Sequence, residues 1–274
     1  MSELEENLDH PKARLLVAGV GTVGDAAVTK MTGHIYNVEC CIVEEVTDDV
    51  ERGIREVDAL FVVYAADDVE AGVIARKLVN IALDAGVLVA VISDRHVPVN
   101  PETSMHTRWP AKVVRLAVNH DSITLHQPDA AEFMSEQGLL NLLFRLAVQQ
   151  ITDLITHISF ICVDFADVKS ICSYGGYGWV GIGHGSGSDG GARDAVRNAL
   201  LALNRQGAPV TTALGILVNI YVSTSATMDD FDEVNRIVHD HICDEAHVIV
   251  GVTSDDLFGR NYRVAMYVVE GELA

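Results

Sequence analysis

The sequence has no apolar run that approaches the roughly 20 residues of a membrane-spanning helix. Its first ten residues, MSELEENLDH, contain neither the basic start nor the apolar stretch of a targeting segment. We therefore expect a cytoplasmic protein. With 274 residues, of which 49% are hydrophobic, the chain can build one large or two medium-sized domains with buried cores.

Cysteine is scarce, and its pattern excludes the common cysteine motifs. The five cysteines are odd in number, include the adjacent pair Cys40 and Cys41, and nowhere show the two-residue spacing of a zinc or redox motif. We therefore expect reduced and mostly buried thiols.

Basic residues are also few. The net charge of −20 would repel a phosphate backbone, so we expect no nucleic acid partner. Five lysines stand against fourteen arginines, and Asp outnumbers Glu. This balance is similar to that of proteins from salt-rich cytoplasm, where dense carboxylates resist aggregation.

Continuous apolar runs alternate with helical patterns through the first half of the chain. Such runs are typical of parallel strands buried on both faces of a sheet, so they predict an α/β, doubly wound, mostly parallel sheet domain. The runs span residues 14–20, 38–43, 59–65, 86–93 and 112–118. The segment from Asp94 to Pro110, which holds three prolines, is predicted to be a loop.

The second half follows a long apolar helix pattern at residues 138–155, which we expect to lie between two bodies. Strand patterns at 157–163, 215–222, 246–252 and 262–269, with helix patterns at 193–203 and 231–242, predict a smaller α+β second domain. We divide the chain into a nucleotide-binding, Rossmann-like domain (12–135), a central helix (136–158) and the α+β domain (159–271).

The pattern Gly19-Val20-Gly21-Thr22-Val23-Gly24 follows the first predicted strand and precedes a helix pattern. Taken alone it is a GxGxxG fingerprint, and Glu44 stands about 20 residues further on, where a ribose-binding acid is expected. Such glycines let backbone amides approach an anion at a helix N-terminus. The candidate nucleotide-binding residues are Gly19, Gly21, Thr22 and Gly24. The alternative is a tight turn without a ligand.

A second glycine-rich stretch spans Gly175 to Val196. It lacks the Gly-Lys-Ser/Thr ending of a phosphate loop, so we interpret it as a structural element of closely packed strands and turns. Asp189 lies near the start of the helix that follows, where an acid favours the helix dipole.

Asp164 and Asp167 stand three residues apart at a predicted strand-to-helix junction. Two carboxylates there can position a water molecule, and the same spacing suits a helix N-cap and its third residue. The spacing alone leaves both interpretations open.

His239 and Cys243 share one face of a predicted helix, with His241 between them and His247 beyond. A solvated helix with one buried cysteine explains this pattern, and we predict no metal site.

A family resemblance enters at residues 149–156, QQITDLIT, followed by VDFADV at residues 163–168. This run closely resembles the FtsZ segment that links the central helix to the second domain. The resemblance continues at residues 180–189, 192–201, 215–220, 231–237 and 248–252, and in the first half at 19–28 and 60–66. The sequence thus resembles a divergent member of the FtsZ/tubulin superfamily.

The resemblance implies a site shared between subunits. In that family the first domain binds GTP, and acids from the second domain of the next subunit activate water against the terminal phosphate. Asp164 and Asp167 stand at those acid positions, which would make them catalytic residues acting on a neighbouring subunit. Cys162 replaces the family's Asn two residues before the first acid.

The pocket side departs from the family pattern. The signature GGGTGTG is replaced by residues 67–73, which is expected to place three carboxylates, of Asp67, Asp68 and Glu70, where a polyanion would sit. Glu44-Glu45-Val46 replaces an Asn-Thr-Asp loop, a further glycine-rich loop is absent, and Leu142 stands where the family reads guanine with an acid. We expect GTP to bind weakly or not at all, and Mg²⁺ only with a nucleotide.

Three hypotheses follow. The first is a polymer partner, cap or regulator in cell division or cell shape, or a nucleotide-independent filament, whose partner is a second copy or a GTP-competent FtsZ or tubulin-like subunit. The second is an active GTPase with a rearranged pocket, which uses Gly19 to Gly24 and a divalent ion at Asp67 or Asp68. The third is a binder of another nucleotide, such as a dinucleotide, through the GxGxxG pattern and Glu44. Since the sequence stops soon after its last predicted strand, we expect no direct membrane binding by the family's C-terminal route.

Overall fold

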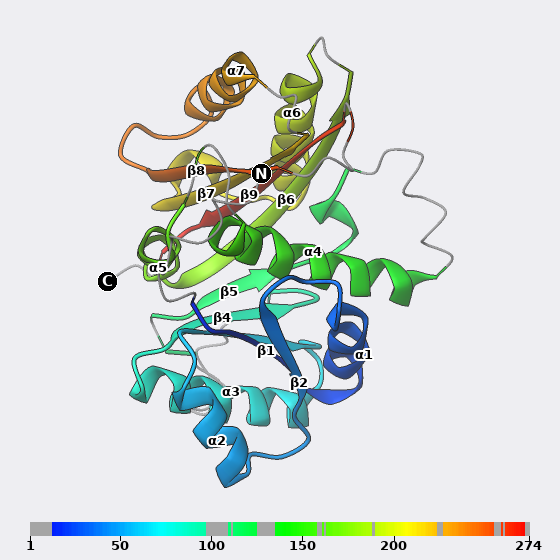
Figure 1. Cartoon of the computed structure of the whole chain (residues 1–274), viewed down its shortest axis with the longest axis vertical. Coiled ribbons are helices and arrows are strands. Elements are labelled where there is room, and N and C mark those ends of the chain that lie inside the picture. Colours follow the sequence, from blue (N-terminus) through cyan, green and yellow to red (C-terminus); the bar gives the residue numbers. More distant parts are fainter. Residues whose placement is uncertain are drawn as a thin grey trace, which may run out of the picture.

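The computed structural model describes residues 13–96, 109–110, 112–124, 135–157, 161, 163–187, 190–223, 227–254, 259 and 261–271. In this part of the chain nine strands form one mixed sheet in the order β2-β1-β3-β4-β5-β6-β9-β7-β8 (Figure 1). The strands from β2 to β6 are parallel to their neighbours. Strand β9 runs antiparallel to β6 and β7, and β8 is parallel to β7.

The first half has the predicted alternation of strands and helices, and all five predicted strands are confirmed. The strands are β1 (Leu15–Gly19), β2 (Val38–Ile42), β3 (Ala59–Tyr64), β4 (Leu88–Ser93) and β5 (Val114–Ala117). The helices are α1 (Gly21–Met31), α2 (Asp48–Arg55) and α3 (Val69–Asp84). The expected burial on both faces is wrong for β2. This strand lies at the edge of the sheet, where Ile42 is 48% exposed.

The central helix α4 (Glu136–Thr156) confirms the predicted long helix. It begins where the Ser135 hydroxyl accepts a hydrogen bond from the Gly138 amide, at 3.1 Å. It contacts α1 in the first half and β7 and β8 in the second, and Figure 1 shows it crossing the molecule between the two halves. Its inner face is buried, with Phe144 and Ile151 in the core.

The second half contains the predicted mixture of helices and strands. The helices are α5 (Phe165–Cys172), α6 (Gly191–Arg205) and α7 (Met228–His239), and the strands are β6 (Gly176–Ser186), β7 (Gly215–Val222), β8 (His247–Ser254) and β9 (Asn261–Val269). Two short 3₁₀ turns occur at His120–Ser122 and Val210–Thr212. Most of the strand predicted at 157–163 lies outside the described residues, as do Cys162 and Asp189.

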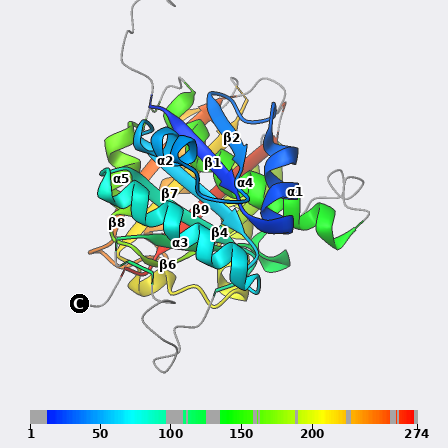
Figure 2. The same cartoon turned by 90° about the horizontal axis from the view of Figure 1, so that it is seen from below.

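The two halves share one sheet because β5 pairs in parallel with β6, from Val114 opposite Gly176 to Ala117 opposite Trp179. Helices α1, α4 and α5 pack on one face of the sheet, while α2 and α3 cover the other face in the first half and α6 and α7 cover it in the second. The view from below shows α3 crossing in front of the strands of the first half (Figure 2). The division into residues 12–135, 136–158 and 159–271 stays a prediction, and the sheet runs across it.

The glycines of β6 confirm the structural interpretation of the second glycine-rich stretch. A Cβ added to Gly181 or Gly183 would lie 2.5 Å or 2.1 Å from a backbone oxygen of α6, and one on Gly185 would lie 2.0 Å from the oxygen of Gly191. These distances leave no room for a side chain. The glycines therefore let α6 pack directly on the strand.

Candidate functional site at the glycine turn

The glycine turn, residues 19–24, lies at the topological switch point of the sheet. The chain leaves β1 for β2 on one side and returns to β3 on the other side of β1. In open α/β sheets, ligands bind outside the carboxyl ends of the strands at such a point. The carboxyl ends of β1 and β3 are therefore the first place to examine for a nucleotide site.

Two of the candidate glycines are required by packing. A Cβ on Gly24 would lie 2.3 Å from the carbonyl oxygen of Val63, and one on Gly19 would lie 2.5 Å from the carbonyl oxygen of Gly24. Helix α1 therefore packs against the backbone of β1 and β3 without intervening side chains. Gly21 has φ of 71°, which a residue with a side chain rarely adopts, and Thr22 is exposed.

The carboxylate of Asp68 lies against this turn. A Cβ on Gly21 would be 2.6 Å from Oδ2 of Asp68 and 2.9 Å from Cβ of Ala71. Asp68 is also the N-cap of α3, because its Oδ1 accepts a hydrogen bond from the Ala71 amide at 2.9 Å. One oxygen thus caps α3 while the other adjoins Gly21, so the turn already has an anionic group from its own chain beside it.

Asp67 and Glu70 are placed differently, which corrects the expectation of three carboxylates acting together at the turn. The Asp67 carboxylate is 70% exposed and pairs with Arg95, at 3.3 Å from Nη2 to Oδ2. Glu70 is exposed in the first turn of α3. Of these three acids, Asp68 is the one that contacts Gly21 in the described part of the chain.

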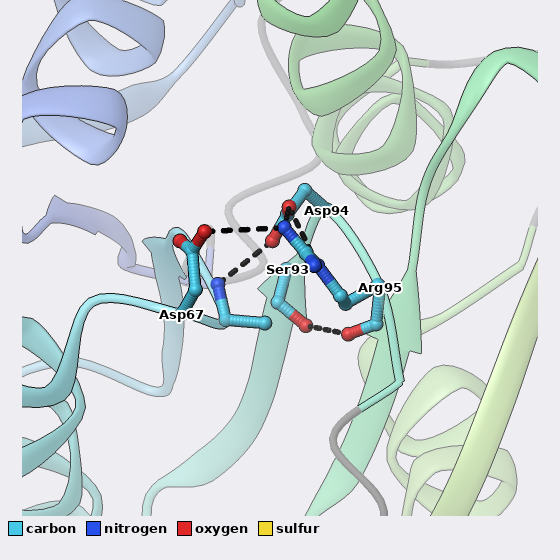
Figure 3. A network of polar contacts seen from close by, with 5 residues as sticks. Asp67, Ser93, Asp94 and Arg95 are labelled. Carbon is cyan, nitrogen blue, oxygen red and sulfur yellow. Dashed lines mark hydrogen bonds and ion pairs between the residues drawn. The ribbon is translucent and has the colours of Figure 1, made fainter.

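A polar network joins the carboxyl ends of β3 and β4 (Figure 3). The Ala66 amide donates to Oδ1 of Asp94 at 2.7 Å, and Arg95 Nε donates to Oδ2 of the same carboxylate at 3.1 Å. Both Asp94 and Asp67 raise the pKa of the Arg95 guanidinium, and the largest cause is the hydrogen bond that Arg95 donates to Asp94. This network was not predicted from the sequence, because the segment from Asp94 has the composition of a loop. The signal for it was the presence of polar residues directly after a predicted parallel strand.

Asp25 and Glu44 add further negative charge near the turn. Burial raises the pKa of the Asp25 carboxyl, and the neighbouring Glu44 raises it further. Within the described chain, Oδ1 of Asp25 is buried without a hydrogen-bond partner. Glu44 itself is exposed. Glu44 thus lies close enough to Asp25 for the two carboxylates to repel one another.

Asp164 and Asp167 form the capping box of α5. The Asp167 amide donates to Oδ1 of Asp164 at 2.8 Å, and the Asp164 amide donates to Oδ2 of Asp167 at 3.1 Å. Of the two interpretations left open by the sequence, the capping role is therefore observed. Asp164 is exposed and Asp167 is half-buried, so both carboxylates remain accessible to a neighbouring molecule. Helix α5 packs against β7 and β8, against α4, and against β4 of the first half.

Leu142, His239 and Cys243 were the other residues singled out from the sequence. Leu142 of α4 is partly buried and packs against the core that α1, α4 and α5 form with one face of the sheet. His239 is exposed at the end of α7, and the Cys243 thiol lies 3.7 Å from the carbonyl oxygen of Ala213. No three or more His, Cys, Asp or Glu side chains among the described residues are grouped so as to hold a metal ion. Nor does any described helix have the length and apolar character needed to cross a membrane.

Comparison with known proteins separates the two halves of the chain. Residues 176–271 match the FtsZ family, C-terminal domain. Over 122 residues the chain is 34% identical to the cell division protein FtsZ of Coxiella burnetii, which is 44% of this chain and 31% of that relative. The match thus spans about a third of the length of the relative.

The solved structures extend the likeness to the whole fold. An empty FtsZ dimer from M. jannaschii superposes with a TM-score of 0.75 at 20% identity, covering 97% of this chain and 90% of that chain. Residues 176–271 thus match the FtsZ C-terminal domain, and the chain as a whole has the fold of FtsZ/tubulin superfamily structures. A second superfamily structure, the GDP-form protofilaments of TubZ from Bacillus thuringiensis serovar israelensis, has a TM-score of 0.62 at 10% identity and covers 96% of this chain and 86% of that chain.

The likeness to FtsZ therefore consists of two kinds of observation. The family match covers residues 176–271 and does not include the glycine turn, which lies in the part of the chain that shares the FtsZ fold. Fold alone does not establish which ligand binds there. The side chains around Gly21 decide which ligand can bind at the turn.

Proposed function

We propose that this chain is an FtsZ-like partner, cap or regulator of filaments in cell division or cell shape, and that Asp68 weakens or prevents GTP binding at its own glycine turn. The contact between Asp68 and Gly21 carries the proposal. The FtsZ match in the second half and the shared fold support membership of a filament system.

The carboxylate of Asp68 lies beside Gly21, the first residue of α1. Backbone amides at a helix N-terminus attract a phosphate. A carboxylate about 4 Å from that phosphate opposes binding by about 4 kcal/mol at an effective dielectric of about 20. This is on the order of a thousandfold in affinity. Because Asp68 also caps α3, its carboxylate is held in place.

The second half of the chain supplies the surface for a partner. By the resemblance, Asp164 and Asp167 correspond to the family's catalytic acids, and both carboxylates remain accessible after capping α5. In this proposal they dock on the GTP and Mg²⁺ of a GTP-competent subunit, while the glycine turn does not recruit a further GTP-bound subunit. Such a subunit would end or modify a filament. If the partner is instead a second copy of this chain, we expect the two copies to associate without a nucleotide.

A GTP-binding measurement tests whether Asp68 weakens or prevents GTP binding at the glycine turn. Isothermal titration of the wild-type chain with GTP and Mg²⁺ is expected to give no saturable signal at about 100 µM GTP. Asp68→Ser keeps an N-cap residue while removing the charge, so it should strengthen GTP binding at least about tenfold. Asp67→Ser is the matched control, since this neighbouring carboxylate is paired with Arg95, and should change binding less. Saturable binding of GTP to the wild-type chain at mid-micromolar concentrations would contradict the proposal that Asp68 weakens GTP binding. It would favour an active GTPase.

Co-sedimentation with a GTP-competent FtsZ tests whether this chain acts on filaments. The wild-type chain should change the pelleted amount or the GTP turnover of that FtsZ. The double variant Asp164→Asn, Asp167→Asn removes two charges while leaving an amide side chain at the N-cap, and should lose the effect. The proposal fails if adding the wild-type chain alters neither filament length nor turnover.

A further inference from the structure

A cavity of about 460 Å³ lies in the second half of the molecule, at the C-terminal part of α6. It is bounded by α6, by the turn that follows it and by His241 beyond the end of α7. This volume is within the range of about 300–1,000 Å³ that small-molecule sites occupy. The cavity is built from other elements than the glycine turn and the α5 cap.

One wall of the cavity is apolar. Leu200 and Leu201 from α6 and Val210 from the following 3₁₀ turn contribute to it. Leu201 is 41% exposed, which is unusual for a leucine on a helix that buries its inner face against β6. An apolar group that entered the cavity would remove part of this leucine from water.

The polar side chains that line the cavity can all donate hydrogen bonds. Arg197, Asn204 and His241 line the cavity, and the lining found in the described chain includes no carboxylate. Arg197 forms no ion pair within the described residues, whereas Arg193, one turn earlier on α6, pairs with Glu233 at 3.6 Å. In a chain of net charge −20, the Arg197 guanidinium is thus a cation available to a ligand.

His241, which also lines the cavity, has a ring held by a backbone contact. Its Nδ1 lies 2.7 Å from the carbonyl oxygen of Ile237, and since a carbonyl only accepts hydrogen bonds, Nδ1 is the donor. This contact holds the ring and leaves Nε2 as its second polar atom.

We propose that this cavity binds a small amphipathic monocarboxylate. The carboxylate pairs with the Arg197 guanidinium, whose planar fork fits two carboxylate oxygens, and the apolar body packs on Leu200, Leu201 and Val210. Charge complementarity selects a carboxylate over a neutral ligand of the same shape, because Arg197 has no acid of its own within the described chain. Binding would link the end of α6 to the segment after α7.

Methyl NMR with labelled Leu and Val tests the proposal, with 3-phenylpropionate as the probe and 3-phenylpropanamide as its neutral counterpart. The acid is expected to shift the methyl signals of Leu200, Leu201 and Val210 in a saturable way. The amide should bind at least about tenfold more weakly. Arg197→Gln should weaken binding of the acid to a similar degree, while Arg193→Gln, one turn away and outside the cavity, should change it less than about twofold.

The comparison of acid with amide uses the wild-type chain, so it does not depend on the stability of a variant. Equal affinity for acid and amide would overturn the proposal, as would an Arg197→Gln variant that binds the acid as well as the wild type does. The absence of saturable shifts at about 10 mM probe would do so too. None of these results depends on GTP or on filaments, so the proposal is separable from the proposed function.

Discussion

Oδ2 of Asp68 lies against Gly21, 2.6 Å from where a Cβ on this glycine would be. The residue that caps α3 thereby also adjoins the turn that begins α1. This contact joins two segments about 47 positions apart in sequence, and its position follows from the parallel pairing of β1 with β3.

Gly24 should not accept a side chain. In Gly24→Ala the new Cβ would lie 2.3 Å from the Val63 carbonyl oxygen, so α1 would have to move away from β3. We expect the free energy of unfolding to fall by about 2–3 kcal/mol in urea titrations. Gly53→Ala in α2 is the control, since no atom lies within 4 Å of its added Cβ, and it should stabilise the protein by about 0.5–1 kcal/mol. Equal effects of the two substitutions would contradict the packing argument.

The capping role of Asp164 predicts a distinct order of stabilities. Asp164→Ala removes the acceptor for the Asp167 amide and should lower the free energy of unfolding by about 1 kcal/mol. Asp164→Asn retains an oxygen acceptor and should remain close to the wild type. Chemical denaturation measures both. If Asn and Ala are equally destabilising, the negative charge rather than the cap accounts for the stability.

His96 predicts a loss of stability in acid. Its ring lies edge-on to Trp179, with centroids 4.8 Å apart, and burial lowers its pKa to about 4, with Arg115 adding to the shift. In the unfolded chain a histidine has a pKa near 6.5, so between about pH 6.5 and pH 4 the unfolded state binds the proton more readily. Stability should therefore fall over this interval, by about 2 kcal/mol after allowance for partial solvent exposure.

The variant His96→Phe isolates this contribution, because it keeps an aromatic ring beside Trp179 and removes the titration. Urea unfolding at several pH values between 7.5 and 4.5 should show a shallower loss of stability than in the wild type. His239→Gln, at an exposed position, should follow the wild-type profile. A His96→Phe profile parallel to that of the wild type would exclude His96 as a source of the acid sensitivity.

A buried hydrogen-bond chain ties α4 to β7 and β8. The side-chain amide of Asn219 donates from Nδ2 to the backbone carbonyl oxygen of Gln150 at 2.8 Å. The Thr253 hydroxyl donates to Oδ1 of Asn219 at 3.0 Å. All three residues are nearly inaccessible to water. Thr253→Val keeps the volume but leaves the Asn219 oxygen unpaired, so it should lower the free energy of unfolding by about 1–3 kcal/mol.

Thr253→Ser is the matched control, because it keeps the hydroxyl and removes a methyl group. Thermal or urea unfolding should show a smaller loss for Ser than for Val, near 1 kcal/mol. A Val variant as stable as the wild type would mean that the hydrogen bond contributes nothing net to holding α4 against the second half.

Much of the fold could be predicted from the sequence, because buried parallel strands are continuous apolar runs. The segments at β1, β3 and β4 are examples, and each is buried throughout. The same pattern was misleading for β2, since burial depends on a neighbour at the sheet edge and a strand sequence does not state its place in the order. The continuation of the sheet from β5 to β6 was likewise not expected.

The sequence by itself determined the family resemblance, the helix and strand types and the presence of carboxylates near a glycine turn, because these depend on local residue identity and spacing. Only the tertiary structure decided that Asp68 contacts Gly21 while Asp67 pairs with Arg95, since adjacent residues at the start of a helix can point in different directions. It likewise assigned Asp164 and Asp167 to a capping box. The cavity beside Arg197 arises from three segments separated in sequence, so only the folded chain shows that their side chains meet.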